Sequence, residues 1–263
     1  MELDRRTLLA AALALPVASG SGSAEGRGIL PTQLAGVVEL RQYTLKGGRR
    51  DELINLFERE FVDSQEAVGS HIIGTFRDLD DPDRFVWIRG FADMEARGRA
   101  LQAFYGGTLW KAHQAAANAT MVDSDNVLLL RPLERLALPA QRSGTSGVIG
   151  VYIHYLGRTP PAAFADFFQR TMAPLLAQQG GRPIATLASE PAANNFPRLP
   201  VREGEPAFIW LTRWPDTKAA DRFEHRRRSA SGWRDGAQEI VLPALMRKPE
   251  RLVLQPTARS ELR

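Results

Sequence analysis

The sequence contains no cysteine. Disulfide bonds, thiolate zinc sites, iron–sulfur clusters and a cysteine nucleophile are therefore excluded. Histidine is also scarce, because only four are present and none stands in HExxH or another ligand-spaced pair, so we predict no metal site. No P-loop, GxGxxG context or GxSxG motif occurs either, which removes the common signatures of nucleotide-binding proteins and serine hydrolases.

Long hydrophobic runs are missing as well. The apolar run from Leu8 to Ala18 is far shorter than the ~20 residues that span a bilayer. It follows Arg5-Arg6 and precedes the small-residue stretch SGSGSA, which ends at Ala24. Paired arginines ahead of a short apolar core are typical of a twin-arginine export signal. We therefore predict a signal peptide over residues 1–24, no transmembrane segment in the mature chain, and an exported, periplasmic or extracytoplasmic location.

The remaining composition is that of a folded protein. The chain has 263 residues and is 44% hydrophobic, which is enough to fill one large core or two smaller ones. The formal net charge is +4, and the 34 basic and 30 acidic residues are interspersed. This pattern indicates a mildly basic, solvated surface.

One aromatic phrase occurs twice, as FVWIRGFAD at residues 85–93 and FIWLTRWPD at residues 208–216. The match extends in both directions, at an offset of 111 residues before the phrase and 123 residues from the phrase onward, because the second copy has a longer loop from Glu190 to Pro206. An internal repeat of this length indicates two similar structural units. The predicted organisation is a first repeat at residues 36–132, a linker at 133–146 and a second, diverged repeat at 147–256.

Hydrophobic periodicity orders each repeat as strand, helix, strand, strand, helix, strand. The first repeat has expected strands at 37–45, 71–78, 84–91 and 120–131, a helix at 51–68, and a second helical region from Asp93 that is broken near Gly106-Gly107. Such a βαββαβ unit is the ferredoxin-like motif, with an antiparallel sheet and both helices on one face. We therefore predict an α+β fold in which the two bare sheet faces meet as an intramolecular dimeric α/β-barrel.

The first repeat resembles the NIPSNAP family of the dimeric α/β-barrel superfamily. The resemblance rests on four blocks, which are ELRQYTL (39–45), RDLDDPDRFVWIRGF (77–91), FYGGTLWKAH (104–113) and NATMVDSDNVLLLRP (118–132). The second repeat resembles the family more loosely and has His154 in place of Tyr43. The wider superfamily includes cofactor-independent monooxygenases, haem-degrading enzymes and haem-dependent enzymes, so the resemblance implies a ligand or substrate site beside the sheets.

Strand parity divides the residues of each sheet between two faces. We expect the aliphatic face to lie under the helices and the aromatic and polar face to line the space between the sheets. The expected ligand-binding residues of that space are Glu39, Arg41, Tyr43, Trp87, Arg89, Tyr152, His154 and Trp210, with Phe91 and Trp214 beside them. This set suits a mostly apolar or planar ligand with an anionic part. The competing interpretation is that the aromatic residues pack the sheets together while Glu39 pairs with Arg41.

Two functions remain open at this point. One is a binding role for a small apolar or planar ligand, and the other is a monooxygenase-like activity on an aromatic substrate, with His154, Tyr152 or Tyr43 as acid or base. His154 is the best catalytic candidate, although a lone strand histidine also fits a structural role. No cofactor is predicted, but haem stays open because of the superfamily. We expect no nucleic-acid partner, since the second repeat would cover the sheet, and homo-oligomerisation remains open.

Overall fold

The computed structural model describes residues 35–134, 147–233 and 238–263. The predicted signal peptide and most of the predicted linker lie outside these ranges. All described residues belong to one compact unit. Within the described ranges, no helix combines the length and the apolar character that crossing a membrane requires.

The first repeat contains four strands with two helical segments between them. The strands are β1 (Val37–Leu45), β2 (His71–Asp78), β3 (Arg84–Phe91) and β4 (Met121–Pro132). The first helical segment consists of α1 (Arg50–Leu56), a π-helical turn η1 (Phe57–Phe61) and α2 (Val62–Glu66). The second consists of α3 (Met94–Gly106) and α4 (Thr108–Thr120), separated at Gly107 as the sequence predicts.

The second repeat follows the same order. Its strands are β5 (Val148–Tyr155), β6 (Pro183–Ser189), β7 (Ala207–Trp214) and β8 (Glu250–Pro256). Its helical segments are α5 (Pro161–Phe167), η2 (Phe168–Met172) and α6 (Ala173–Gln178), and then α7 (Thr217–Ser229) and α8 (Gln238–Ala244). The π-helical turn recurs at the aligned position, because η1 begins at Phe57 and η2 at Phe168.

Local signals explain where several helices begin and end. Asp93 and Asp216 occupy equivalent N-cap positions, and their side chains accept hydrogen bonds from the backbone of Ala96 and Ala219 at 2.7 Å. Gly180 adopts φ +94° just after α6, a conformation that glycine reaches without steric cost. Pro160 is the N-cap of α5, which begins at Pro161.

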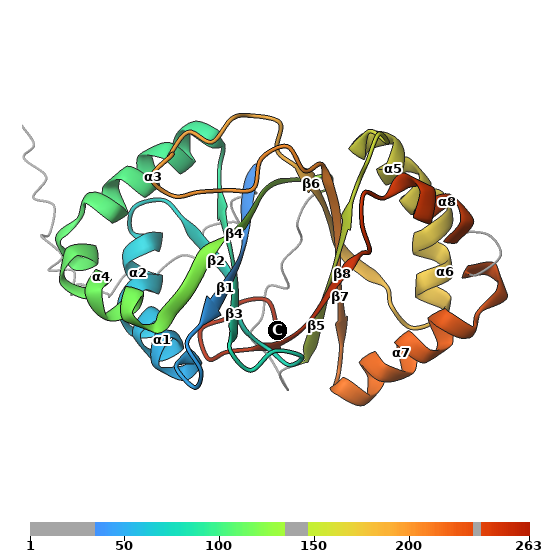
Figure 1. The fold of residues 1–263 in the computed structure, drawn as a ribbon, viewed down its shortest axis with the longest axis horizontal. Helices are drawn as coiled ribbons and strands as arrows, with labels where there is room; N and C mark the ends of the chain where they lie inside the picture. The colour runs from blue at the N-terminus through green and yellow to red at the C-terminus, as the bar shows by residue number, and fades with distance from the viewer. Residues whose placement is uncertain (1–34, 135–146, 234–237) are drawn as a thin grey trace, which may run out of the picture. The chain divides into compact units, whose positions relative to one another are not determined.

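The eight strands close into one antiparallel barrel in the order β1-β3-β2-β8-β5-β7-β6-β4 (Figure 1). Each repeat contributes a four-stranded sheet. The two seams are short, since β2 pairs with β8 through three residues and β4 pairs with β6 through three more. Helices α1–α4 cover the outer face of the first sheet and α5–α8 that of the second (Figure 1). The predicted fold class, two tandem ferredoxin-like repeats in an intramolecular α/β-barrel, is confirmed.

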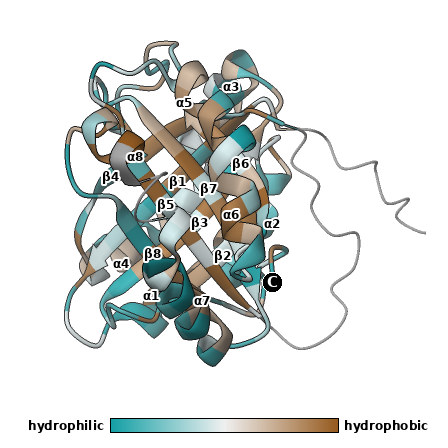
Figure 2. Ribbon diagram, turned by 90° about the vertical axis from the view of Figure 1, so that its right-hand side faces the viewer, coloured by the Kyte–Doolittle hydropathy of each residue, from teal (hydrophilic) through white to brown (hydrophobic). Residues whose placement is uncertain are grey.

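The assignment of the two sheet faces is reversed relative to the sequence-based expectation. The space between the sheets is filled by one cluster of mainly branched aliphatic side chains from both repeats, which includes Val38, Leu40, Val86, Ile88, Ile149, Val151, Ile209 and Leu211. Figure 2 shows hydrophobic residues on strands of the barrel and also on α6, whereas α7 is mainly hydrophilic. Alternation separates the two faces of a strand, but it does not identify which one meets helices when both are buried.

The aromatic faces pack under the helices instead. Trp87 belongs to a cluster with Tyr43, Phe57 and residues of α1, α3 and α4, and Trp210 belongs to a separate cluster under α5–α8. The expectation that Trp87 and Trp210 look toward each other's sheet across one interior is therefore wrong. The space between a sheet and its helices accepts large rings, whereas two directly packed sheets about 10 Å apart favour branched aliphatic side chains.

Candidate functional site

The eight predicted ligand-binding residues lie in two separate places, both on the helix-covered faces. Five are buried under the helices of the first repeat, and these are Glu39, Arg41, Tyr43, Trp87 and Arg89. The other three are Tyr152, His154 and Trp210, which line a cavity under the helices of the second repeat. None of the eight lines the space between the sheets, so an inter-sheet site built from them is ruled out.

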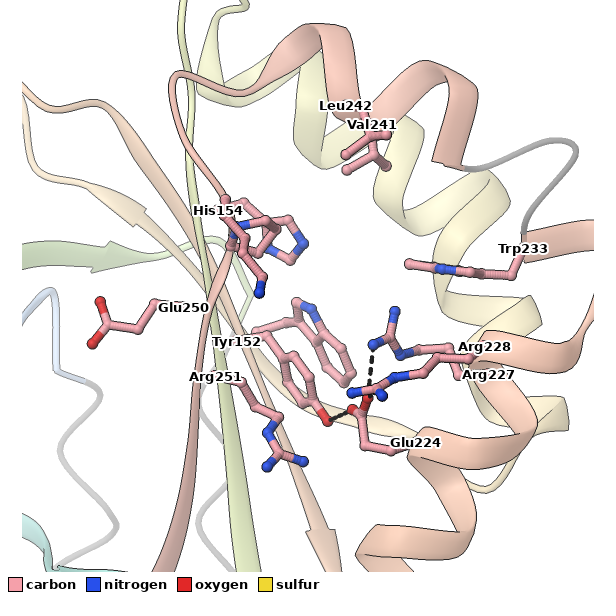
Figure 3. A pocket seen from close by; sticks show the side chains of 13 residues that line it. Tyr152, His154, Glu224, Arg227, Arg228, Trp233, Val241, Leu242, Glu250 and Arg251 are labelled. Atoms are coloured by element: carbon pink, nitrogen blue, oxygen red, sulfur yellow. Dashed lines mark hydrogen bonds and ion pairs between the residues drawn. The ribbon is translucent and has the colours of Figure 1, made fainter. Parts of the chain in front are cut away.

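The cavity of the second repeat measures about 700 Å³. Strands β5 and β7 supply Tyr152, His154 and Trp210, and the helical side is formed by α7, the segment around Trp233, and α8 (Figure 3). Val241 and Leu242 of α8 lie across from the sheet (Figure 3). Apolar side chains therefore face the cavity from both the sheet and α8, as is usual in a small-molecule pocket.

Two stacked rings form the floor. The rings of Tyr152 and Trp210 lie 4.1 Å apart between centroids and 5° from parallel. The Tyr152 hydroxyl donates a hydrogen bond of 2.5 Å to Glu224 Oε1 on α7. Burial raises the pKa of the Tyr152 phenol well above its usual range, and the neighbouring Glu224 carboxylate raises it further. Tyr152 is therefore a neutral donor at physiological pH.

Glu224 links this floor to the basic end of α7. Arg227 Nη2 lies 2.7 Å from Glu224 Oε2, and the Arg227 guanidinium also covers the ring of Trp233 at 4.8 Å. Burial by itself raises the pKa of the Glu224 carboxyl, but the hydrogen bond and charge of Arg227 outweigh it and hold the pKa below its usual value. The chain of Tyr152, Glu224 and Arg227 is thus a fixed polar wall (Figure 3).

His154 is the titratable group best suited to proton transfer in the cavity. It is buried, and its Nδ1 has no hydrogen-bond partner among the described residues. Burial, assisted by the positive charge of Arg227, lowers the pKa of His154 to about 4. The imidazole is therefore neutral at pH 7, and the same burial makes it a weak base.

The cavity also has an excess of positive charge. Its lining includes four cationic side chains, Arg227, Arg228, Lys248 and Arg251, and two carboxylates, Glu224 and Glu250. Arg228 is largely exposed, and its Nε comes no closer than 3.7 Å to Glu224 Oε2, so its charge is available to a ligand. An apolar floor with a cationic rim matches a planar or apolar molecule that carries a negative group.

The five predicted residues of the first repeat form a buried charge network around one carboxylate. Glu39 Oε2 accepts hydrogen bonds from Arg41 Nη1 and Arg89 Nε, both at 2.8 Å, and Oε1 accepts one of 2.6 Å from Arg97 Nε. Burial raises the pKa of the Glu39 carboxyl, but the three arginine charges outweigh it and hold the pKa well below its usual range. Glu39 therefore pairs with Arg41, as the competing interpretation expects, and with two further arginines. The other part of that interpretation is wrong, because the aromatic residues pack under the helices and not between the sheets.

One group of side chains has the composition of a metal site. Glu66, His71 and Glu261 each offer a ligand atom within 4.8 Å of the others. His71 Nε2 lies 2.9 Å from Glu261 Oε2, and the hydrogen bond with Glu261, aided by its negative charge, raises the pKa of His71. Since this pairing accounts for the proximity of His71 and Glu261, we assign no metal-binding role.

Sequence reasoning missed the helical side of the cavity. The interspersed charges predict a solvated surface, yet Arg227 is half-buried against Glu224 and Trp233. The available signal was the spacing of Glu224 to Arg227 and Arg228, which places all three on one side of α7. Lys248 and Arg251 carry no such signal, because the pairing of β8 with β5, which sets Arg251 opposite Tyr152, is what brings the start of β8 to the cavity.

The fold has solved relatives of nearly equal length. A candidate monooxygenase from Lactobacillus acidophilus superposes with a TM-score of 0.53 and 16% identity over 84% of this chain and 94% of its own. An anthrone oxidase-like protein superposes with a TM-score of 0.59 and 15% identity, over 84% of this chain and 91% of its own. A candidate monooxygenase from Fusobacterium nucleatum superposes with a TM-score of 0.52 and 10% identity, over 85% of this chain and 93% of its own. These likenesses concern the fold alone, and no curated protein sequence matches the chain.

The family resemblance of the first repeat can be tested directly on the sequence. The NIPSNAP family model matches residues 38–137, from the start of β1 past the end of β4. The matched range includes all four blocks on which the resemblance rests. The resemblance of the first repeat to the NIPSNAP family is therefore confirmed by a match of the family model to residues 38–137.

Proposed function

We propose that the second repeat binds a small, partly apolar anion in the cavity under α7 and α8. The observation that carries the proposal is the pairing of a stacked Tyr152–Trp210 floor with a rim of four cations and two carboxylates. The floor would hold a ring by stacking, and the rim would hold its negative group. The fixed Tyr152–Glu224–Arg227 wall would orient the ligand without rearranging.

The test is a titration with an anionic naphthalene sulfonate and with neutral 1-naphthol, read from tryptophan fluorescence, because Trp210 and Trp233 both line the cavity. Arg228→Met should weaken the affinity for the sulfonate about twofold to fivefold, as expected for one exposed charge pair, and leave the affinity for 1-naphthol unchanged. Arg226→Met is the matched control, since Arg226 is exposed on the same helix but outside the cavity lining. Equal effects of the two variants would contradict a rim role for Arg228.

A second candidate function is a cofactor-independent oxidation, favoured by the neutral His154 with its unpartnered Nδ1. The name of one structural relative suggests anthrone as the probe. His154 would accept a proton from the methylene carbon, and the resulting anion would reduce O₂. Overall, the CH₂ group becomes a carbonyl, one O₂ is consumed and one water is released. The base returns unchanged.

This second function is tested by following anthraquinone formation together with O₂ uptake. A general base contributes about 10²–10⁴ in rate, so His154→Gln should reduce turnover by at least the lower of these factors. Equal rates in the variant and in the absence of protein would rule out the activity. An absorption spectrum of the purified protein separates both functions from a haem-binding use of His154, because bound haem gives an intense Soret band.

We also propose that the chain is exported through the twin-arginine route. The support is the sequence pattern of Arg5-Arg6, the short apolar run and the small-residue stretch before Ala24. Replacing both arginines with lysine should retain the full-length chain in the cytoplasm of a bacterial host that has this route. Cell fractionation and the size of the exported form measure the outcome, and normal processing of the variant would contradict the assignment.

A further inference from the structure

The charge network of the first repeat has more positive charge than its own residues neutralise. Arg41, Arg89 and Arg97 are all 0% exposed, and in the described part of the chain Glu39 is the only carboxylate that pairs with them. Three guanidinium groups against one carboxylate leave a net charge of +2 in the interior. Buried charges are costly unless they are paired, so this arrangement calls for additional negative charge.

Several donors in the network are unused. Arg41 Nη2, Arg97 Nη2 and Trp87 Nε1 are buried and have no hydrogen-bond partner among the described residues. The Trp87 ring lies 5.3 Å from the guanidinium carbon of Arg41 and 4.9 Å from that of Arg89, so these groups form one cluster. Cation–π contacts ease the burial of the arginines but do not satisfy their N–H donors.

The network is covered by a segment from the other repeat. The loop between β6 and β7 reaches across to α3 (Figure 1). Arg97 Nη1 donates to the side-chain oxygens of Asn194 at 3.0 Å and Asn195 at 2.6 Å. Asn195 is held by the Met94 carbonyl, and Phe196 stacks on Tyr105 with centroids 5.8 Å apart. Neutral amide oxygens therefore stand where a charged oxygen would pair better with Arg97.

We propose that the first repeat binds a small oxyanion, a carboxylate or a phosphate, at Arg41 and Arg97 beneath the 190–206 loop. The anion takes the place of the two asparagine oxygens at Arg97 and supplies acceptors to the unused Nη2 groups. Planar guanidinium groups bind carboxylate and phosphate oxygens through paired hydrogen bonds, which is why these two anion types are the expected ligands. Arg89 remains committed to Glu39 and to Gln65 Oε1 at 2.7 Å, so it orients the site.

The experiment has two arms, because a tightly held anion would escape a simple titration. The purified protein is denatured and the released anions are quantified by ion chromatography. A second sample is dialysed into chloride buffer and titrated with sodium phosphate and with sodium acetate, using the thermal midpoint and calorimetry, against sodium chloride at equal ionic strength. We expect either equimolar release of one oxyanion or a saturable rise in the midpoint. Neither release nor a rise beyond that of chloride would overturn the proposal.

Variants localise the effect. Arg97→Met should weaken the affinity for the oxyanion by about tenfold or more, as expected for the loss of a charge-assisted hydrogen bond. Arg99→Met is the matched control, because Arg99 is exposed on the same helix, and it should change nothing. If Arg97→Met does not fold, Asn195→Ala decides: it removes a competing acceptor, so the oxyanion should bind more tightly. Equal affinity in Arg97→Met and Arg99→Met, or weaker binding in Asn195→Ala, would overturn the proposal.

Discussion

The two repeats share a backbone plan and differ most in what lies between sheet and helices. The four charged residues of the first-repeat network, Glu39, Arg41, Arg89 and Arg97, align with Gly150, Tyr152, Thr212 and Ala220 of the second repeat. The first repeat therefore encloses a charge network, and the second has a cavity floored by stacked rings. All four network positions differ together, which is expected because a buried charge left without its partners is strongly destabilising.

The largest effect should come from removing the carboxylate at the centre of the network. Glu39→Gln leaves three buried arginines without a counter-charge and should lower the free energy of unfolding by about 3–5 kcal/mol. Urea denaturation followed by circular dichroism measures it. Glu224→Gln in the second repeat is the control, and it should cost less because Arg227 is partly exposed and can be hydrated. Equal losses would show that the two polar clusters do not differ in this respect.

His154 of the second repeat should make stability depend on pH between 6.5 and 4. The pKa of His154 falls from 6.5 to about 4 on folding, so the unfolded chain binds more protons between these values. Stability should therefore decrease as the pH falls from 6.5 toward 4, by about 3 kcal/mol from this residue. Denaturation across this range in the parent and in His154→Gln isolates the contribution, since the variant should lose that part of the slope.

His71 of the first repeat provides a control of opposite sign. Its pKa is raised, chiefly by the hydrogen bond with Glu261, so its contribution is present below pH 6.5 and is lost as the pH rises through the folded-state value. His71→Gln should therefore remove stability at low pH only. If His154→Gln loses as much unfolding free energy as the parent between pH 6.5 and 4, that result would contradict the burial of a neutral imidazole.

A smaller effect is expected where the second repeat has glycine in place of Glu39. A Cβ at Gly150 would overlap the ring of Trp214, which cannot retreat freely because its Nε1 donates to the Gly180 carbonyl at 3.0 Å. Gly150→Ala should cost about 1–3 kcal/mol through overpacking. Gly106→Ala, in a helix with open space around the Cβ, should be neutral or stabilising by about 0.4–1 kcal/mol. Thermal unfolding of both variants checks the difference.

The smallest effect concerns the contact between repeats. Phe196→Leu removes the stacking on Tyr105 and should cost about 0.5–1.5 kcal/mol. Hydrogen exchange should become faster in α3 of the first repeat, although the substitution lies in the second. Phe167→Leu, at a partly buried ring on α5, is the control and should leave α3 unchanged. Unaltered exchange in α3 would show that the 190–206 loop does not protect it.

The sequence predicted the fold well because its signals are local and doubled. Period-two strands and the break at Gly106-Gly107 each specify a short segment, and the repeat supplies the second half. The face assignment failed for a physical reason. Both Val38 and Glu39 are fully buried, so neither marks a solvent side from which the inner face could be inferred.

The candidate site was only partly predictable. Tyr152 and His154 of β5 and Trp210 of β7 share one face of the sheet and could be grouped by strand parity. Glu224, the hydrogen-bond partner of Tyr152, lies 72 residues further along the chain, and only tertiary packing brings its carboxylate to the Tyr152 hydroxyl. The Asn195 contact with Arg97 crosses from one repeat to the other, so no pattern within either repeat contains it.

The 190–206 loop has a further consequence for symmetry. In a homodimer of identical chains, every insertion occurs twice and alters both equivalent sites. Here the two repeats belong to one chain, and the long loop occurs once. It covers the charge network of the first repeat at Arg97 and does not alter the cavity of the second repeat. Covalent fusion therefore permits one half of the barrel to be modified independently of the other, which a symmetric assembly of the same fold cannot do.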